Sequence, residues 1–299
     1  MLALASPASL KGVLTAGEAA TALARGLRSA GAEAEELPLA DGGEGTAVVL
    51  GAEVLRVERV HDAFGHDREA PVRALVDGTV VLESAEAIPF DPSRLDVQAA
   101  SSRGFGELIA RAGPCEQLLV CLGGTATMDA GAGVLEALAQ LPAPTTVLCD
   151  TRATLAEAPR LFGPQKGATA GEVAELERRF ATMPLADREG GGAAGGLGAA
   201  LASLGAQLVP GAAYVLEATG FRERAAQAEL VICGEGTVDR TTFEGKAPGE
   251  AARACAELGV RCLLFGGRVE DGVEALALSG DPARAREDLE ELGVALGGA

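Results

Sequence analysis

The distribution of apolar and polar residues predicts alternating strands and helices at the start of the chain. An apolar run at residues 2–5 is followed by a helical pattern at residues 16–30 and by a second apolar run at residues 34–39. Thr15 and Glu18 occupy the N-cap and third positions of that helix and can form a capping box. A strand, helix and strand in this order predict a right-handed βαβ unit with parallel strands.

The same order returns near the end of the chain. Residues 230–233 form an apolar run, residues 248–258 follow a helical pattern, and residues 261–265 form another apolar run. Gly259 comes directly after the helical pattern, where a glycine commonly ends a helix. Both ends of the chain therefore predict parallel α/β structure.

The middle of the chain follows a different pattern. Apolar and polar residues alternate at residues 54–60, and two short apolar runs around an Asp77-Gly78 turn favour further antiparallel strands at residues 72–75 and 79–82. Helices and strands then alternate again, at residues 104–112, 117–122, 130–138 and 146–149. We therefore predict a two-domain α/β protein. Residues 1–48 and 226–299 form an outer parallel α/β domain, and residues 49–225 form an inserted α/β domain with an antiparallel hairpin region.

Composition and charge exclude several classes of function. A net charge of −18 repels nucleic-acid backbones, and eight Phe, one Tyr and no Trp leave little to stack on bases. No run approaches 18 apolar residues and no basic segment precedes the short apolar start, so we expect neither a membrane protein nor an exported one. The six cysteines form no CxxC pair and favour a reducing cytoplasm. His61 and His66, the two histidines, support neither a zinc site nor a histidine triad and are expected at the surface.

Candidate chemistry lies in loops that follow predicted strands. The hexapeptide at residues 41–46 combines two carboxylates, Asp41 and Glu44, with Gly42, Gly43 and Gly45 and the hydroxyl of Thr46. Glycine lets backbone N–H groups approach an anion, and carboxylates bind hard cations or move protons. Alone, this stretch could equally be a surface turn. Four further clusters also follow predicted strands, at Lys11-Gly12, residues 123–129, Asp150 and residues 234–239. Open parallel sheets bind ligands at this edge, so we interpret the loops as one site.

Two glycine-rich loops and two lysines are candidate anion ligands. The loop at residues 123–129 leads into a helix, so its N–H groups and the hydroxyls of Thr125 and Thr127 could hold an anion, or it could be a plain turn. The Gly and Ala run that begins at residue 190 is either a flexible linker or, as we favour, an anion loop opening a helix at residues 197–204. Lys166 and Lys246 stand among glycines and could meet phosphate or be solvated.

Familiar nucleotide fingerprints do not fit the chain. Gly245-Lys246 is not a P-loop, because Arg240 stands where its first glycine should be and Ala247 replaces the metal-binding hydroxyl residue. No G-x-G-x-x-G lies between a strand and a helix, which leaves a dehydrogenase supported by fold-level analogy alone.

Six motifs in matching order resemble the ATP-dependent glycerate kinases of the bacterial type that make 2-phosphoglycerate. They are Leu-Ala-Asp41-Gly-Gly-Glu-Gly-Thr, Leu122-Gly-Gly-Thr-Ala-Thr-x-Asp129-x-Gly-Ala-Gly, Cys149-Asp150, Phe162-Gly-Pro-Gln-Lys166-Gly-Ala, Gly192-Ala-Ala-Gly-Gly-Leu-Gly198 and Gly234-Glu-Gly-x-x-Asp239-x-x-Thr-x-x-Gly-Lys246-Ala-Pro. The resemblance runs from about residue 5 to residue 268. It implies a flavodoxin-like inserted domain, ATP and Mg²⁺ as cofactors, and phosphorylation of a small hydroxy acid, D-glycerate, in an interdomain cleft.

The resemblance also suggests roles for individual residues. Asp41, Glu44 and Asp239 would bind Mg²⁺ or deprotonate the acceptor hydroxyl, with the order of these roles left open, and Lys11 and Lys246 would offset negative charge. A larger set would bind substrate or phosphate: Gly42, Gly43, Thr46, Gly123, Gly124, Thr125, Thr127, Asp129, Lys166, Gly195, Gly196 and Glu235. We expect small-molecule partners, no nucleic acid and no membrane, and the pattern indicates no particular oligomeric state.

Several positions depart from the family's usual pattern. Ala8 replaces an Asp, Met128 an Asn, and Thr237 and Thr241 what are commonly Arg and Gln, which would remove charges or amides from the expected cleft. The chain is also short between residues 138 and 145 and after residue 268, where we expect a reduced closing strand and helix. These departures keep an alternative open, a degenerate homologue that binds a sugar acid or nucleotide without catalysis.

Overall fold

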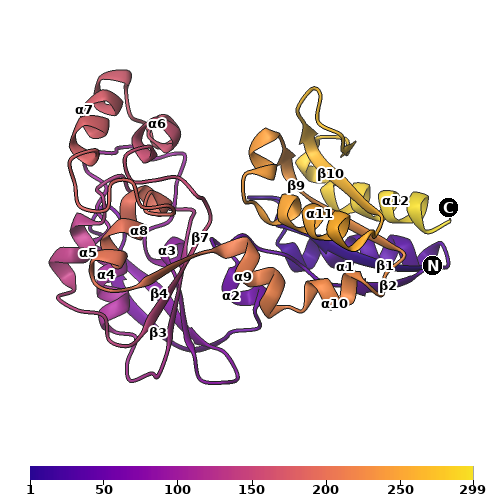
Figure 1. The fold of residues 1–299 in the computed structure, drawn as a ribbon, viewed down its shortest axis with the longest axis horizontal. Helices are drawn as coiled ribbons and strands as arrows, with labels where there is room; N and C mark the ends of the chain where they lie inside the picture. The colour runs from indigo at the N-terminus through magenta and orange to yellow at the C-terminus, as the bar shows by residue number, and fades with distance from the viewer. Residues whose placement is uncertain (299) are drawn as a thin grey trace. The chain divides into compact units, whose positions relative to one another are not determined.

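The computed structural model describes residues 1–298 and divides them into two compact units. Unit 1 comprises Met1–Asp41 and Ala212–Ala299, and unit 2 comprises Gly42–Gly211. The two ends of the chain, indigo and yellow in Figure 1, thus belong to the same unit. The domain limits expected from the sequence, after residues 48 and 225, stay a prediction.

Unit 1 is built on a parallel sheet with the order β11-β10-β9-β1-β2. Its strands are β1 (Leu2–Pro7), β2 (Glu33–Glu36), β9 (Leu230–Val238), β10 (Cys262–Val269) and β11 (Leu276–Ala277). The α-helices of unit 1 are α1 (Ala16–Ser29), α9 (Gly211–Ala218), α10 (Phe221–Ala225), α11 (Ala247–Leu258) and α12 (Ala285–Gly297). The predicted parallel units at both chain ends are confirmed, and α1 begins with the predicted capping box of Thr15 and Glu18.

The central strands of unit 1 are buried on both faces, which explains their continuous apolar runs. Leu230 and Ile232 of β9 pack in the cluster that contains residues of α1 and α12. Val231 and Cys233, with the opposite orientation, pack in the cluster that contains residues of α10 and α11. Successive side chains of a strand point to opposite faces, so one short apolar segment supplies both cores.

One expectation for unit 1 is corrected, and another stays open. Residues 234–238, which resemble a loop in sequence, belong to β9 and pair with β10. A glycine is needed there, because a Cβ on Gly234 would lie 2.3 Å from the carbonyl oxygen of Phe265. The closing strand β11 is two residues long, and the closing helix α12 has 13 residues and packs against α1. Their expected reduction relative to the family stays a prediction.

Unit 2 is built on a mixed sheet with the order β3-β4-β5-β6-β7-β8. Its strands are β3 (Glu53–His61), β4 (Asp67–Ala74), β5 (Val80–Glu83), β6 (Leu118–Leu122), β7 (Thr145–Cys149) and β8 (Gln207–Pro210). The β3-β4 and β4-β5 pairs are antiparallel and the other pairs are parallel. The predicted class, a parallel α/β domain and a second α/β domain with an antiparallel region, is confirmed.

The helices of unit 2 enclose two apolar clusters. They are α2 (Thr46–Val49), α3 (Ser84–Ala87), α4 (Arg103–Ala110), α5 (Ala132–Ala137), α6 (Ala158–Phe162), α7 (Ala170–Phe180) and α8 (Ala193–Ser203). Phe105 of α4 and Leu197 of α8 belong to the main core with residues of the sheet. Phe180 of α7 belongs to a separate cluster that includes Met128 and Leu155.

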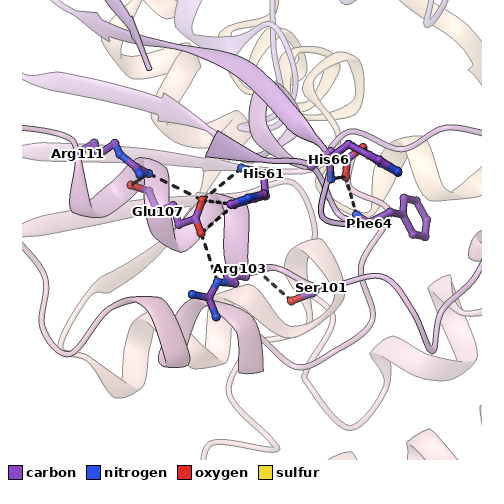
Figure 2. Close-up of polar contacts among 8 residues, drawn as sticks. His61, Phe64, His66, Ser101, Arg103, Glu107 and Arg111 are labelled. Atoms are coloured by element: carbon purple, nitrogen blue, oxygen red, sulfur yellow. Dashed lines mark hydrogen bonds and ion pairs between the residues drawn. The ribbon is translucent and has the colours of Figure 1, made fainter. Parts of the chain in front are cut away.

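Both histidines lie at the surface of unit 2, as predicted, and each contacts a carboxylate. Figure 2 shows the carboxylate of Glu107 between the His61 ring and the guanidinium groups of Arg103 and Arg111. The His61 Nδ1–Glu107 Oε2 distance is 2.9 Å, and His66 Nδ1 lies 3.1 Å from Asp62 Oδ2. The contact of His61 with Glu107 ties the end of edge strand β3 to α4, and the contact of His66 with Asp62 lies within the turn between β3 and β4.

The structure also describes the cysteines and the apolar character of the helices. All six cysteines, which lie within the described residues, are unpaired thiols, and Cys121, Cys149, Cys233 and Cys255 are buried. None of the helices within residues 1–298 is both long and apolar enough to cross a membrane.

Candidate functional site

In unit 2, the loops at residues 42–46 and 123–129 meet beside the end of β7. A Cβ on Gly123 would lie 2.5 Å from the Asp150 carboxylate oxygen Oδ2 and 2.9 Å from Gly43 Cα. A Cβ on Gly124 would lie 3.2 Å from Glu44 Oε2. Side chains at these positions would push the segments apart. The structure thus brings together three clusters that the sequence placed after separate strands.

Within the first loop, the predicted site residues differ in exposure. Glu44 is exposed, so its carboxylate is available to a ligand. Gly42, Gly43 and Thr46 are buried, and the Thr46 hydroxyl has no hydrogen-bond partner. Gly42 has a φ of +98°, and a Cβ on it would lie 2.7 Å from Gly211 Cα, so the tight turn requires glycine. Glu44 therefore lies at the surface of the loop, whereas Gly42 and Gly43 pack against the rest of unit 2.

Glu83 and Ser84, at the end of β5 and the start of α3, hold both loops. The Glu83 carboxylate accepts hydrogen bonds from the N–H groups of Gly45, at 3.0 Å, and Ala47, at 2.6 Å. The Ser84 hydroxyl donates to the Gly123 carbonyl and accepts from the Gly123 N–H, both at 3.2 Å. Burial raises the pKa of Glu83 to about 7, although the two N–H groups act to lower it.

Lys166 has its ammonium inside unit 2, beneath the loop at residues 123–129. Nζ donates to the Thr127 carbonyl at 2.8 Å and lies 3.4 Å from the Thr125 hydroxyl oxygen. Burial lowers its pKa to about 8, while the carboxylates of Asp150 and Asp129 act to raise it. The ammonium thus offsets part of the negative charge of Asp150 and Asp129, and its hydrogen bond to Thr127 stabilises the loop.

Asp129 makes structural contacts at the start of α5. Its Oδ2 accepts hydrogen bonds from Ser102 N, Ser102 Oγ and Gly133 N, and its Oδ1 accepts one from Gly131 N. These bonds join the start of α4 to the start of α5. Its predicted role in binding substrate stays a prediction.

The glycine run at residues 192–198 packs against the same loop. The helix α8 is kinked there, with left-handed backbone at Ala194, Gly195 and Gly196. A Cβ on Gly195 would lie 1.9 Å from the Thr127 carbonyl oxygen, and the Thr127 hydroxyl donates to the Ala194 carbonyl at 3.4 Å. The run is buried and allows close approach of two backbones. Phosphate binding by Gly195 and Gly196 stays a prediction.

Unit 1 carries a second polar cluster, between β9 and the start of α11. Lys246 Nζ lies 3.4 Å and 3.5 Å from the two carboxylate oxygens of Glu235, and Thr242 Oγ1 donates to Glu235 Oε1 at 2.8 Å. Burial raises the pKa of Glu235, Lys246 acts to lower it, and Asp41 acts to raise it further. Asp41 and Glu235 are therefore close enough to interact.

Asp239 completes this cluster. Its Oδ1 accepts hydrogen bonds from Thr241 N, Thr241 Oγ1 and Thr242 N, and lies 3.9 Å from Lys246 Nζ. Burial acts to raise the pKa of Asp239, but these hydrogen bonds and the ammonium outweigh it and hold the pKa below its ordinary value. Lys11 is exposed, and its backbone nitrogen would lie 3.7 Å from a Cβ on Gly236.

The candidate cation ligands have the donor chemistry that suits magnesium. Within residues 1–298, no three His, Cys, Asp or Glu side chains form a group that could hold a metal ion by themselves. Asp41, Glu44 and Asp239 offer carboxylate oxygens, the donors that Mg²⁺ prefers, and Mg²⁺ commonly takes one or two carboxylates together with substrate phosphates.

The departures from the family pattern have different surroundings. Met128 is fully buried in the apolar cluster with Leu155 and Phe180, so it is a core residue. The expectation that it removes an amide from the cleft is wrong in this respect. Thr237 and Thr241 are exposed, and the Thr241 hydroxyl contacts Asp239.

The sequence had not singled out Glu83 and Ser84. The sequence contained a signal, because Glu83 is a charged residue that directly follows the apolar residues of β5. In the structure Glu83 is only 4% exposed. A carboxylate that is buried at a strand end needs hydrogen-bond donors, and glycine-rich loops supply them.

Comparisons with known proteins agree with the motifs. The family model described as the glycerate kinase family matches residues 3–142 and 141–283. Glycerate kinase of Bacillus subtilis (strain 168) is 34% identical over 344 residues, covering 92% of this chain and 89% of the relative. Glycerate 2-kinase of Escherichia coli (strain K12) is 32% identical over 300 residues, covering 81% and 79%.

A solved structure extends the similarity to the fold. The crystal structure of a protein assigned as glycerate kinase 2 from Salmonella typhimurium LT2 matches with a TM-score of 0.76 and 29% sequence identity. The match covers 99% of this chain and 97% of that one. The chain therefore belongs to the glycerate kinase family, as its motifs predicted.

Proposed function

We propose that this protein transfers the γ-phosphoryl group of ATP to the 2-hydroxyl of D-glycerate, giving 2-phosphoglycerate. Membership of the family and the relative named glycerate 2-kinase support the reaction and the position of the phosphate. The observation that carries the proposal is the composition of the two clusters. Each combines a lysine with carboxylates, which suits charge neutralisation in phosphoryl transfer.

The chemistry divides among residues of both units. The acceptor hydroxyl loses its proton to a carboxylate as its oxygen bonds to phosphorus, and the bond from phosphorus to the β-phosphate oxygen breaks. Lys246 and Lys11 offset the negative charge that moves to the leaving group. Asp239, held ionised by its hydrogen bonds, is suited to a cation, while Asp41 and Glu44 supply the base or a further ligand. Mg²⁺ would supply additional neutralisation of the phosphates.

The two clusters are proposed to act on the same pair of substrates, in a cleft between the domains. If so, a substitution of a catalytic residue in the cluster of either unit should abolish turnover. The loop at residues 123–129 and its lysine support, Lys166, would orient the glycerate carboxylate or a phosphate. A cytoplasmic location belongs to the same proposal, supported by the six unpaired cysteines.

One assay tests the proposal. Turnover is measured with Mg-ATP and D-glycerate, and the product position is read by phosphorus NMR. We expect 2-phosphoglycerate from the natural protein, and a loss of about 100-fold or more in kcat for Asp41→Asn and Asp239→Asn. Folded protein that binds Mg-ATP but phosphorylates neither D-glycerate nor other hydroxy acids would instead support the non-catalytic alternative. An unchanged rate in Asp41→Asn would refute the central assignment.

A further inference from the structure

We propose that Glu83 and Ser84 are positioning residues that fix the two glycine loops of unit 2 relative to each other for phosphoryl transfer. We call these two residues and their hydrogen bonds the clamp. The kinetic consequence of the inference rests on the proposed function, whereas the clamp itself is a property of the fold. The two residues are consecutive, and each contacts a different loop: Glu83 holds Gly45 and Ala47, and Ser84 holds Gly123. Neither residue is a candidate for contact with substrate.

The burial of both side chains makes this clamp specific. Glu83 is 4% exposed and Ser84 is fully buried. Water therefore cannot easily replace a lost bond, and an unpaired N–H group in such a place is destabilising. The contacts are also complete: both Glu83 oxygens accept an N–H, and the Ser84 hydroxyl both donates and accepts.

The position of the clamp in the sheet connects it to the candidate carboxylates. Gly45 and Ala47 flank Thr46 at the start of α2, so the bonds from Glu83 fix the segment directly after Glu44. Gly123 contacts Gly43 and Asp150 in turn. The orientation of the Glu44 and Asp150 carboxylates relative to each other thus depends on β5.

The clamp needs Glu83 in its ionised form. A carboxylate offers strong acceptors on both oxygens. An amide must point its NH2 toward one of the two N–H groups, and a protonated carboxyl has only a weaker acceptor on its hydroxyl oxygen. The surrounding groups act in opposite directions, because Glu86 of α3 raises the pKa of Glu83 and Arg73 of β4 lowers it. Cys121 of β6 faces the same two carboxylates and Glu44 acts on Glu86. Burial, the largest influence, leaves the pKa of Glu83 at about 7.

The first experiment needs no turnover. In NMR spectra of the natural protein between pH 5.5 and 8.5, we expect the Gly45 and Ala47 amide signals to shift together with a midpoint near pH 7. In Glu83→Gln, a nearly isosteric change, this titration is expected to disappear. In the control Glu86→Gln the titration remains and its midpoint moves to lower pH, because a neighbouring negative charge is removed. Gly45 and Ala47 amide signals in Glu83→Gln that coincide with those of the natural protein at pH 8.5 would overturn the clamp.

The second experiment links the clamp to catalysis. One pH unit below its pKa a carboxyl is about one-tenth ionised, so the ratio of kcat between natural protein and Glu83→Gln is expected to fall about tenfold from pH 8 to pH 6. Substrates titrate equally in both proteins, and the ratio cancels their effect. Ser84→Ala is expected to lower kcat about threefold to tenfold at every pH, with KM for ATP nearly unchanged.

A failure of the proposed function can be told apart from a failure of the clamp. If the natural protein does not phosphorylate D-glycerate but its Gly45 and Ala47 amides titrate as described, the proposed function is wrong and the clamp stands. If the protein is active and Glu83→Gln keeps the natural kcat and pH profile, the clamp has no positioning role and the inference is overturned. Should Glu83→Gln not fold, the amide titration of the natural protein and the kinetics of Ser84→Ala still decide.

Discussion

Replacement of Lys166 by methionine removes a positive charge from the interior of unit 2 while keeping a side chain of similar length. Lys166 is 6% exposed, and its Nζ donates to the Thr127 carbonyl at 2.8 Å. Burial lowers its pKa from 10.5 to about 8. The folded protein thus holds the proton less tightly than the unfolded chain does.

The sign and size of the effect follow from this shift. Between pH 8 and pH 10.5 the unfolded chain binds a proton that the folded protein has released, so the stability contributed by Lys166 increases as pH rises. Integration of the shift from pH 7 to pH 10 gives a gain of about 2.5 kcal/mol in the free energy of unfolding of the natural protein. Lys166→Met lacks this gain. At pH 7 the natural protein bears a cost of about 3 kcal/mol for the buried charge, which the variant avoids. The variant instead leaves the Thr127 carbonyl unpaired, at a cost of about 1–3 kcal/mol, so the two effects largely cancel.

The assay is urea unfolding of both proteins at intervals between pH 7 and pH 10. We expect similar stabilities at pH 7 and a difference at pH 10 of about 2.5 kcal/mol in favour of the natural protein. Thr125→Val is the matched control, because it changes the surroundings of the ammonium and keeps the lysine, so the pH-dependent gain should remain. Parallel curves for the natural protein and Lys166→Met would refute the buried-charge argument.

Three further predictions concern packing and capping. Gly123→Ala should lower kcat at least tenfold, because its Cβ would lie 2.5 Å from the Asp150 carboxylate, whereas Gly171→Ala, with nothing within 4 Å, should leave kinetics unchanged. Met128→Asn, which restores the residue usual in the family, should destabilise the protein by about 2–4 kcal/mol without raising kcat, measured by urea unfolding and turnover. Thr15→Ala should remove the capping box of α1 and cost about 1 kcal/mol in urea unfolding, and a larger change in turnover than in stability would contradict its structural role.

Local signals in the sequence account for the parts of the fold that could be predicted. The capping box at Thr15 and the stop at Gly259 are formed by residues within one turn of the helix ends, so they can be read from a short window. The strand β4 was predicted only from residue 72, although it begins at Asp67. Its first half carries charges and Pro71, and it becomes a strand because β3 pairs with it, a contact that no local window contains.

The candidate site shows the same division between local and distant causes. The loop at residues 123–129 and Asp150 lie together because β6 and β7 are neighbouring parallel strands that end at one edge of the sheet. The loop at residues 42–46 meets them for another reason, since the strand before it, β2, belongs to the sheet of unit 1. The direction of individual side chains was not predictable. Lys166 and Met128 point into the interior because segments far apart in the sequence pack around them, and Glu83 is buried because β5 lies between β4 and β6.

The surroundings of Met128 and Thr241 change the weight of the non-catalytic alternative. That alternative depends on polar groups missing from the expected cleft, yet Met128 fills an apolar core, where an amide would need partners that the cluster does not offer. Thr241 contributes its N–H and hydroxyl to Asp239, so the substitution leaves the candidate cation ligand with two hydrogen bonds from that position. The case for lost catalysis therefore reduces to the shortened segments and to two substitutions, Ala8 and Thr237. Neither belongs to the bonded clusters around Lys166 and Lys246, which retain the charges that phosphoryl transfer requires.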